Sequence, residues 1–359
     1  MFNQEIKCIY QKKKGSQFGN TIEFMELMVL IFGFIFGAII QYASLNKYNT
    51  ISGLATLENL AVAKAIALAI GIGSILLSIT IGFDYATFHI KPFILGGIVL
   101  GGLIFGSGMA ILGYCPGTLV ISVGEGALDA LIGILGGLLG GWVFTLLLPS
   151  FSQFLGPNLG DISVNSLMGS GWAFYALTAI LGILFATIAF WLNKFEKIKD
   201  NKWVYAGIAL AILNTIIFLK ATSNRPIGAS TTFPYLADVL TGTTQNDYFN
   251  QIKPHGAWEA IFLAGAFIAG LIISLIKKEF KLTLIYSNWE KYRGKNKNQR
   301  IFWAFIGGFL LIFGARMAGG CTSGHILSGG MQLSISSLVF AVFTFIGLLI
   351  TGKYFYLKK

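Results

Sequence analysis

Two of the three cysteines lie in short stretches of glycine and small polar residues within otherwise apolar sequence. The first cysteine loop reads Gly113-Tyr-Cys-Pro-Gly-Thr118, and the second cysteine loop reads Gly319-Gly-Cys-Thr-Ser-Gly-His325. A thiol is polarisable and a weak hydrogen-bonding group, so it suits a soft sulfur atom better than a hard phosphate oxygen. Cys115 and Cys321 in series therefore indicate a narrow path for a sulfur-bearing anion. The alternative for either cysteine alone is plain packing as a small apolar side chain.

Both loops contain helix breakers, and non-helical backbone at membrane depth persists only where protein or a watery cavity surrounds it. Pro116 lacks a backbone donor and restricts Cys115 to extended conformations. We therefore expect each cysteine at the tip of a broken or re-entrant helix, with new helices beginning near Gly117 and Ser323. The free N–H groups of such helix starts, and nearby hydroxyl groups, suit an anion. These hydroxyls belong to Thr118, Thr322 and Ser323.

A charged side chain accompanies the second loop. Arg316 lies five residues before Cys321 in an apolar window, and charge inside a membrane is costly enough to indicate function. It would attract the anion or pair with an acidic group such as Glu125, unless it is an interfacial, snorkelling arginine. His325 would donate to a ligand or cap a nearby carbonyl. The predicted substrate-binding set is Gly113, Cys115, Pro116, Gly117, Thr118, Arg316, Gly320, Cys321, Thr322, Ser323 and His325.

The remaining polar features carry weaker signals. The segment Arg225–Thr232 is either a further broken-helix element along the path or an ordinary solvated loop. Cys8 lies in a polar tail without glycine neighbours, and we interpret it as incidental. The cysteines form no C-x-x-C pair and no zinc-binding pattern, so we expect no disulfide framework, metal or cofactor.

The elements that must position these loops are membrane helices. The chain is 55% hydrophobic and only 11% charged, with a mean hydropathy of +0.73, whereas soluble domains carry about 25% charged residues. Apolar windows long enough to cross a bilayer predict an all-α polytopic membrane protein with about nine crossings. They fall at 24–44, 61–81, 92–113, 127–148, 172–192, 203–219, 258–276, 301–319 and 333–352.

The basic residues between these windows predict orientation rather than a nucleic-acid partner, although the net charge is +11. With the N-terminus outside and the C-terminus cytoplasmic, the inner face receives the lysines of 194–202, the cluster of 277–300 and the C-terminal lysines, as the positive-inside rule favours. The lysines of the N-terminal tail oppose this choice. The long apolar stretch after the tail indicates a membrane helix and not a cleaved signal peptide.

An internal repeat appears when the chain is shifted by 206 residues. This shift aligns Cys115 with Cys321, together with flanking glycines and serines, so each half carries four crossings with its cysteine loop between the third and fourth. The predicted parts are a tail (1–23), a first repeat (24–171), a connecting helix and loop (172–202) and a second repeat (203–359). Five crossings separate the two starts, which makes the repeats inverted, an arrangement typical of transporters with a midplane site.

Two segments carry a resemblance to a known family. Gly102-Leu-Ile-Phe-Gly-Ser-Gly-Met-Ala-Ile-Leu-Gly-Tyr-Cys-Pro-Gly-Thr118 and Gly314-Ala-Arg-Met-Ala-Gly-Gly-Cys-Thr-Ser-Gly-His325 resemble the YeeE/YedE family, also called the sulphur transport family. The resemblance implies an hourglass-shaped inner-membrane protein that takes up thiosulfate, with Cys115 and Cys321 relaying the ion by S–H hydrogen bonds without covalent chemistry. It also implies a small sulfur-carrier protein as a cytoplasmic partner. Some members are linked to selenium instead.

One departure from the family pattern concerns the substrate. Thiosulfate carriers of this family have a further cysteine after the first crossing, whereas the stretch Gln41–Asn49 has none. A two-thiol path therefore leaves thiosulfate, another sulfur or selenium species as alternatives. A membrane thiol–disulfide oxidoreductase is a further alternative, although such enzymes commonly bring a C-x-x-C motif. A packing-only scaffold subunit is the last one. No nucleotide-binding motif is present, and we expect a carrier and not an enzyme.

Overall fold

The structure, a computed structural model, describes residues 24–196 and 200–356, and this part of the chain is mostly helical. Cys8, the tail lysines and the last three residues lie outside it. Eight of the described helices are long and apolar enough to cross a membrane, which confirms a polytopic helical membrane protein. These eight spans are Phe24–Tyr42, Ala61–Gly82, Leu95–Gly124, Leu128–Leu155, Trp172–Leu192, Asp247–Ile276, Lys297–Met317 and Ile335–Phe355.

The predicted windows match these helices, with three differences. The ninth window is helix α9, Lys202–Phe218, whose 17 residues make it shorter than the other spans. Helix α11 begins at Asp247 rather than near 258, because Asn246 caps it by accepting a hydrogen bond from the Phe249 N–H at 2.7 Å. The joint 46–59 is not simply a connection, since it contains the buried helix α2, Tyr48–Ala55.

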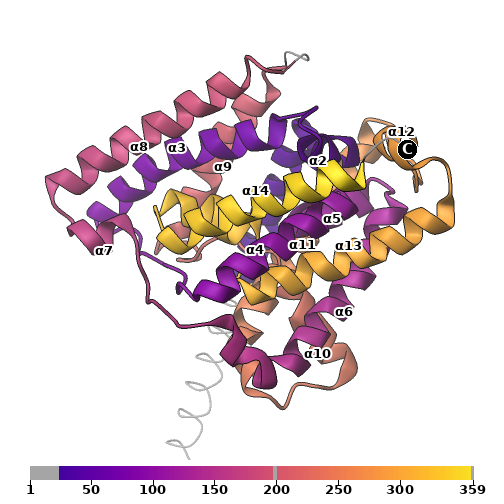
Figure 1. Ribbon diagram of the computed structural model, residues 1–359. Coiled ribbons are helices and arrows are strands. Elements are labelled where there is room, and N and C mark those ends of the chain that lie inside the picture. The colour runs from indigo at the N-terminus through magenta and orange to yellow at the C-terminus, as the bar shows by residue number, and fades with distance from the viewer. Residues whose placement is uncertain (1–23, 197–199, 357–359) are drawn as a thin grey trace, which may run out of the picture.

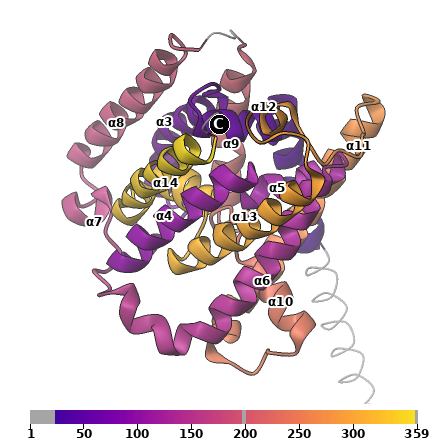
Figure 2. The ribbon, with the colours of Figure 1, turned by 45° about the vertical axis from the view of Figure 1, so that its right-hand side comes forward.

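Three helices lie side by side through the middle of the molecule (Figures 1 and 2): α4 (Leu95–Leu112), α13 (Lys297–Met317) and α14 (Ile335–Phe355). Glycines permit this close approach, as in other membrane helix pairs. A β-carbon placed on Gly101 would come within 2.7 Å of the Gly314 carbonyl oxygen, and one on Gly108 within 2.9 Å of the Gly307 oxygen. Residue 101 thus meets 314 where residue 108 meets 307, so α4 and α13 run antiparallel.

The remaining helices surround this centre. Helix α6 (Leu128–Phe151) packs on α13 and on the short α10 (Thr232–Thr241), and α11 packs on α10 and on the half-helix α5 (Pro116–Gly124). Helix α3 (Ala61–Gly82) holds α8 (Trp172–Leu192) and α9 at one side, as Figure 2 shows. The smaller elements are η1 (Ser152–Leu155), α7 (Val164–Met168), α12 (Ser287–Arg293) and η2 (Thr322–Gly329).

The helix partners match when the two halves are exchanged. In the first half α4 packs on α14, and in the second half its equivalent α13 packs on α6. Likewise α5 packs on α11, and its equivalent η2 packs on α3. The short helix α2 packs on α14, and its equivalent α10 packs on α6. Equivalent helices α4 and α13 run antiparallel, which is the direction that an inverted repeat requires. The repeat as a whole stays a prediction.

Three segments predicted to share the cytoplasmic face come together at one end of the molecule. Glu196 accepts a hydrogen bond from the Leu60 N–H at 2.9 Å, and the neighbouring Glu58 pairs with Lys291 at 2.5 Å. Arg293 in turn donates to the Phe355 carbonyl at 3.3 Å. Residues 194–196, segment 277–300 and the end of α14 therefore lie near one another.

Candidate functional site

The first cysteine loop begins where α4 ends, at Gly113. This glycine has φ +81°, a left-handed conformation, and the Tyr48 ring fills the space that a side chain would need. Cys115 is extended (φ −103°, ψ 165°), as expected before proline, and Pro116 opens α5. The new helix thus begins one residue before the predicted Gly117.

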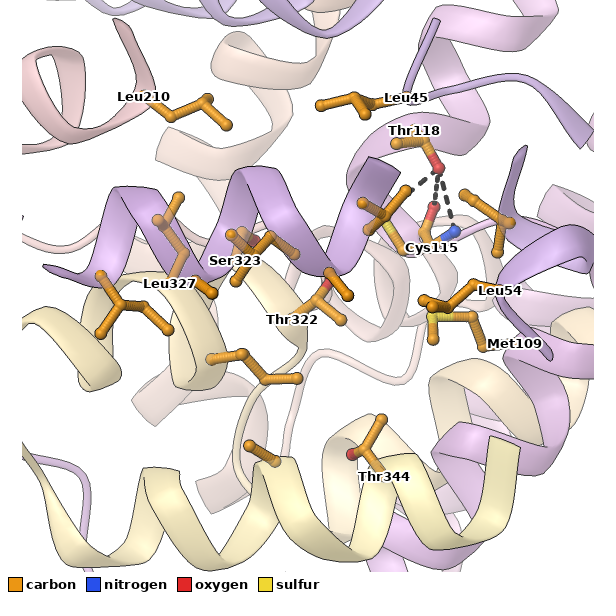
Figure 3. A pocket seen from close by; sticks show the side chains of 18 of the residues that line it. Leu45, Leu54, Met109, Cys115, Thr118, Leu210, Thr322, Ser323, Leu327 and Thr344 are labelled. Carbon is orange, nitrogen blue, oxygen red and sulfur yellow. Dashed lines mark hydrogen bonds between the residues drawn. The ribbon is translucent and has the colours of Figure 1, made fainter. Parts of the chain in front are cut away.

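Thr118 holds the first loop in shape (Figure 3). Its hydroxyl accepts the Cys115 N–H at 2.9 Å and donates to the Cys115 carbonyl, 3.1 Å away. The same Oγ1 lies 3.3 Å from the Cys115 sulfur. The thiol therefore has a neighbouring hydroxyl that sets its position at the start of α5.

A buried ion pair supports the first cysteine loop at the end of α4. Arg300 and Asp129 are both fully buried, 2.5 Å apart, and the Tyr114 hydroxyl donates to Asp129 at 3.1 Å. Arg300 also donates to the Ile111 and Leu112 carbonyls at 3.2 and 2.7 Å, which satisfies backbone groups left free at the end of α4. Sequence reasoning missed this pair, because Arg300 and Asp129 lie 171 residues apart.

The second cysteine loop follows α13, which ends at Met317. Gly319 has φ +74° and is exposed, with open space on the side where a β-carbon would lie. Cys321 is buried, its sulfur lies 3.2 Å from the Ser323 hydroxyl, and Thr322 begins η2. This element has π-helical turns, which are frequent at functional sites.

His325 braces the second loop from inside. It is fully buried, with Nε2 2.8 Å from the Ala318 carbonyl and Nδ1 2.9 Å from the Ser337 hydroxyl. Both ring nitrogens thus have partners within the chain. Of the two roles predicted for His325, the structure shows the contact with a nearby carbonyl. Gly320 is confined by the same ring, because a β-carbon there would come within 2.8 Å of His325 Cδ2.

The two loops meet beside a cavity of about 260 Å³ (Figure 3). Cys115 of the first loop and Thr322 and Ser323 of the second loop line this cavity together. The cavity surface is almost entirely apolar. Its few polar lining residues are Cys115, Thr118, Thr322, Ser323 and Thr344.

Cationic side chains gather on the other side of Cys321. Arg316 is buried in α13 and donates to three hydroxyls, those of Tyr248 (2.9 Å), Ser230 (3.2 Å) and Thr231 (3.0 Å). It does not pair with Glu125, which lies near the first loop and pairs with Lys47 at 2.7 Å. That suggested partner was wrong. A buried charge bonded to neutral hydroxyls keeps most of its attraction for an anion.

The segment Arg225–Thr232 supplies two of these hydroxyls. Residues 227–232 are buried, so the solvated-loop alternative was wrong for most of the segment, and α10 follows directly. Glu259 of α11 accepts the Thr231 N–H at 2.7 Å and lies 3.8 Å from Arg225. The segment therefore places a third turn of irregular backbone against the second loop.

Lys91 is a site residue that the sequence did not reveal, because it lies in a joint between spans. Its ammonium group donates to the Gly319 carbonyl at 2.7 Å, and it interacts electrostatically with Cys321. Burial of the ammonium, and then repulsion from Arg316, lower the pKa of Lys91 to about 8. Lys91, Arg225 and Arg316 form the cationic cluster, which faces one carboxylate, Glu259.

The structure thus brings the predicted residues into two adjoining groups. Gly113 and Gly320 shape the loops, the hydroxyls of Thr118 and Ser323 lie beside the sulfurs, and Arg316 stands behind Cys321. Gly117 has ordinary room for a β-carbon, 3.6 Å from Phe36, so packing does not require a glycine there. Among the described residues, no three His, Cys, Asp or Glu side chains converge as a metal site would require.

The chain matches one family of known proteins over most of its length. Residues 43–350 match the family described as Sulphur transport. The chain belongs to this family. It is similar to the thiosulfate transporter TsuA of Spirochaeta thermophila, with 25% identity over 336 residues that cover 89% of this chain and 95% of that protein. This sulphur transport protein therefore matches its relative along nearly the whole length of both chains.

Proposed function

We propose that this protein carries a small sulfur-containing anion, first of all thiosulfate, across the bacterial inner membrane. Cys321 and Cys115 act in series and relay the ion through S–H hydrogen bonds, without a covalent step. The observation that carries the proposal is one apolar cavity lined by Cys115 of the first cysteine loop and by Thr322 and Ser323 of the second, with cations beside Cys321.

The charges support an order for the relay. An anion is drawn first to Arg316 and its neighbours, which lie beside Cys321. Thr322 and Ser323 line the adjoining cavity together with Cys115. Thiols and hydroxyls can thus replace, one after another, the water that a sulfur anion loses on leaving solution.

The positions of basic residues support a direction. The lysine-rich segments meet near Lys291, at the end of the molecule away from Lys91. If that end is cytoplasmic, as positive charge favours, then Cys321 receives the ion from outside and Cys115 passes it inward. The C-terminus is then cytoplasmic, the N-terminus is outside, and a sulfur-carrier protein would receive cargo on the cytoplasmic side. In this view the halves are inverted repeats around the two loops.

A second candidate is transport of another sulfur or selenium species. Where family thiosulfate carriers have a further cysteine, this chain has the buried amides Gln41 and Asn46. Asn46 donates to Ser122 at 3.3 Å, and Gln41 donates to the Gly270 carbonyl at 3.3 Å. Amides are harder ligands than a thiol, so this region favours an oxygen-rich anion such as sulfite or selenite over hydrosulfide.

The deciding experiment is uptake of radiolabelled thiosulfate by proteoliposomes that contain the purified full-length chain. We expect Cys115→Ala and Cys321→Ala each to abolish uptake while expression and thermal unfolding stay close to those of the parent. Cys8→Ala is the matched control and should keep full uptake. Normal uptake in both loop variants would contradict the relay.

Competition assays separate the substrates. Excess unlabelled thiosulfate should block uptake of the label, and sulfite, selenite or hydrosulfide should compete only if the path accepts them. A thiol–disulfide enzyme would instead show the two cysteines cycling into a disulfide during turnover, which mass spectrometry of the quenched protein detects.

A further inference from the structure

The side chain of Lys91 covers the open face of the second cysteine loop. Its ammonium donates to the Gly319 carbonyl at 2.7 Å, and a β-carbon on Gly320 would meet Lys91 Cε at 3.0 Å. Gly319 itself is exposed, with open space before it. Lys91 therefore lies at the exposed edge of the second cysteine loop, in contact with the backbone that precedes Cys321.

The backbone around Lys91 is anchored by hydrogen bonds, whereas its side chain is bonded through the ammonium to the Gly319 carbonyl. The Lys91 carbonyl accepts a hydrogen bond from Ser336 at 2.9 Å, and Pro92 follows it. Two residues earlier, the His89 N–H and carbonyl both bond to the Gln332 side chain, at 2.6 and 3.2 Å. Lys91 is thus a long, flexible and partly exposed side chain on an anchored backbone, and it carries a compact charge at its end.

The contact that Lys91 makes is weak compared with the one that an anion would offer. When an anion arrives, the ammonium exchanges its hydrogen bond to a neutral carbonyl for a hydrogen bond to the anion. The new bond is stronger because both of its partners are charged. The neighbouring charges favour the exchange, because cations outnumber carboxylates there. The charged and titratable groups that interact with Lys91 are Arg225, His255, Glu259, Arg316, Cys321 and His325.

We propose that Lys91 is a displaceable latch on the second cysteine loop, which releases the Gly319 carbonyl and binds the arriving sulfur-bearing dianion ahead of Cys321. This rests on the proposed function and adds a specificity-determining residue to it. A latch that exchanges a carbonyl for an anion selects by charge, so a dianion competes better than a monoanion of similar size.

The titration of Lys91 gives the latch a signature. With its pKa at about 8, the ammonium is mostly charged at pH 7 and mostly neutral at pH 9. Raising the pH across this range removes the charge that attracts the dianion, so the KM for thiosulfate should rise. A purely structural lysine would leave the KM unchanged over the same range.

The test uses proteoliposomes with the same pH inside and outside, and measures thiosulfate uptake between pH 6.5 and 9.5. For the parent, we expect KM to rise about tenfold from pH 7 to pH 9. Lys91→Arg should keep a low KM at both values, since arginine stays protonated throughout. Lys91→Gln should show the high KM at every pH. Lys220→Gln is the control, because Lys220 is an exposed lysine paired with Asp84 outside this cluster.

Two results would overturn the latch. One is a Lys91→Gln variant with the parent's KM and pH profile; the other is a Lys91→Arg variant that keeps the parent's rise. Thermal unfolding of each variant identifies a misfolded protein, and Lys91→Arg keeps the test decisive if Lys91→Gln fails to fold. If Cys321→Ala still transports, the relay itself is wrong. If Cys321→Ala is dead while Lys91→Gln behaves as the parent, only the latch is wrong.

Discussion

The two cysteine loops share a sequence pattern and differ in their surroundings. Around Cys115 the charges are neutralised in the Arg300–Asp129 pair, and the thiol faces an apolar cavity. Around Cys321 the charge of Arg316 is not neutralised by a carboxylate bonded to it. The two cysteines therefore differ in their surroundings: an apolar cavity lies beside Cys115, and an arginine without a bonded carboxylate lies beside Cys321.

The residue differences between the halves are specific. The 206-residue shift places Ala110 opposite Arg316 and Leu119 opposite His325. The first half therefore lacks both the cation and the imidazole at the equivalent points, and α5 is an ordinary α-helix where η2 is π-helical. The loops are equivalent in position and distinct in chemistry.

The largest expected effect concerns the ion pair that supports the first cysteine loop. Arg300→Met leaves the buried Asp129 carboxylate without its cation, and breaking such a pair costs about 3–5 kcal/mol. We expect a large drop in the melting temperature of the detergent-solubilised protein. The double variant Arg300→Met/Asp129→Asn should recover part of the loss, and Lys291→Met, which breaks an exposed pair with Glu58, should change the melting temperature little. An unchanged melting temperature for Arg300→Met would show that the Arg300–Asp129 pair does not stabilise the first cysteine loop.

At the second loop we expect a smaller effect on stability than that of Arg300→Met, together with a clear effect on uptake. Arg316→Gln removes the unneutralised cation, so the KM for thiosulfate should rise about tenfold, equal to about 1.4 kcal/mol. Arg316→Lys should restore most of the affinity because the charge remains. Equal KM values for Arg316→Gln and the parent would mean that the charge of Arg316 does not attract the anion to the second loop.

The smallest expected effect sharpens the comparison at the sulfur atoms. Thr118→Val removes the hydroxyl beside Cys115, and a lost hydrogen bond of about 1 kcal/mol corresponds to roughly a fivefold fall in uptake rate. Thr118→Ser keeps the hydroxyl and should keep uptake. Ser323→Ala at the second loop should have a weaker effect, since the cationic cluster also orients the ion there.

Sequence alone predicted the helical spans well, because long apolar windows leave the chain few other choices. The window 172–192 coincides with α8, which packs mainly on α3 and leaves much of its surface exposed. The window at 258 was too short, since α11 continues through Lys253 and Pro254 into a polar first turn. Polarity marks where a span meets water, and it does not mark where a helix ends.

The candidate site was predicted only where residues lie close in sequence. Cys115 with Thr118, and Cys321 with Ser323, follow from local order. Lys91 reaches Gly319 across 228 residues, and nothing in its own joint distinguishes it from a surface lysine. Contacts of this kind depend on how helices pack, which a single sequence does not display.

The apolar cavity beside Cys115 has an electrical consequence. Apolar cavities tend to stay dry, and a stretch without water blocks chloride and protons from crossing by hydration or by hopping along a water chain. A cell that maintains a voltage across its membrane can then keep this protein in place without a leak current. Under the proposed relay, a cargo passes this stretch by exchanging its water for sulfur and hydroxyl contacts.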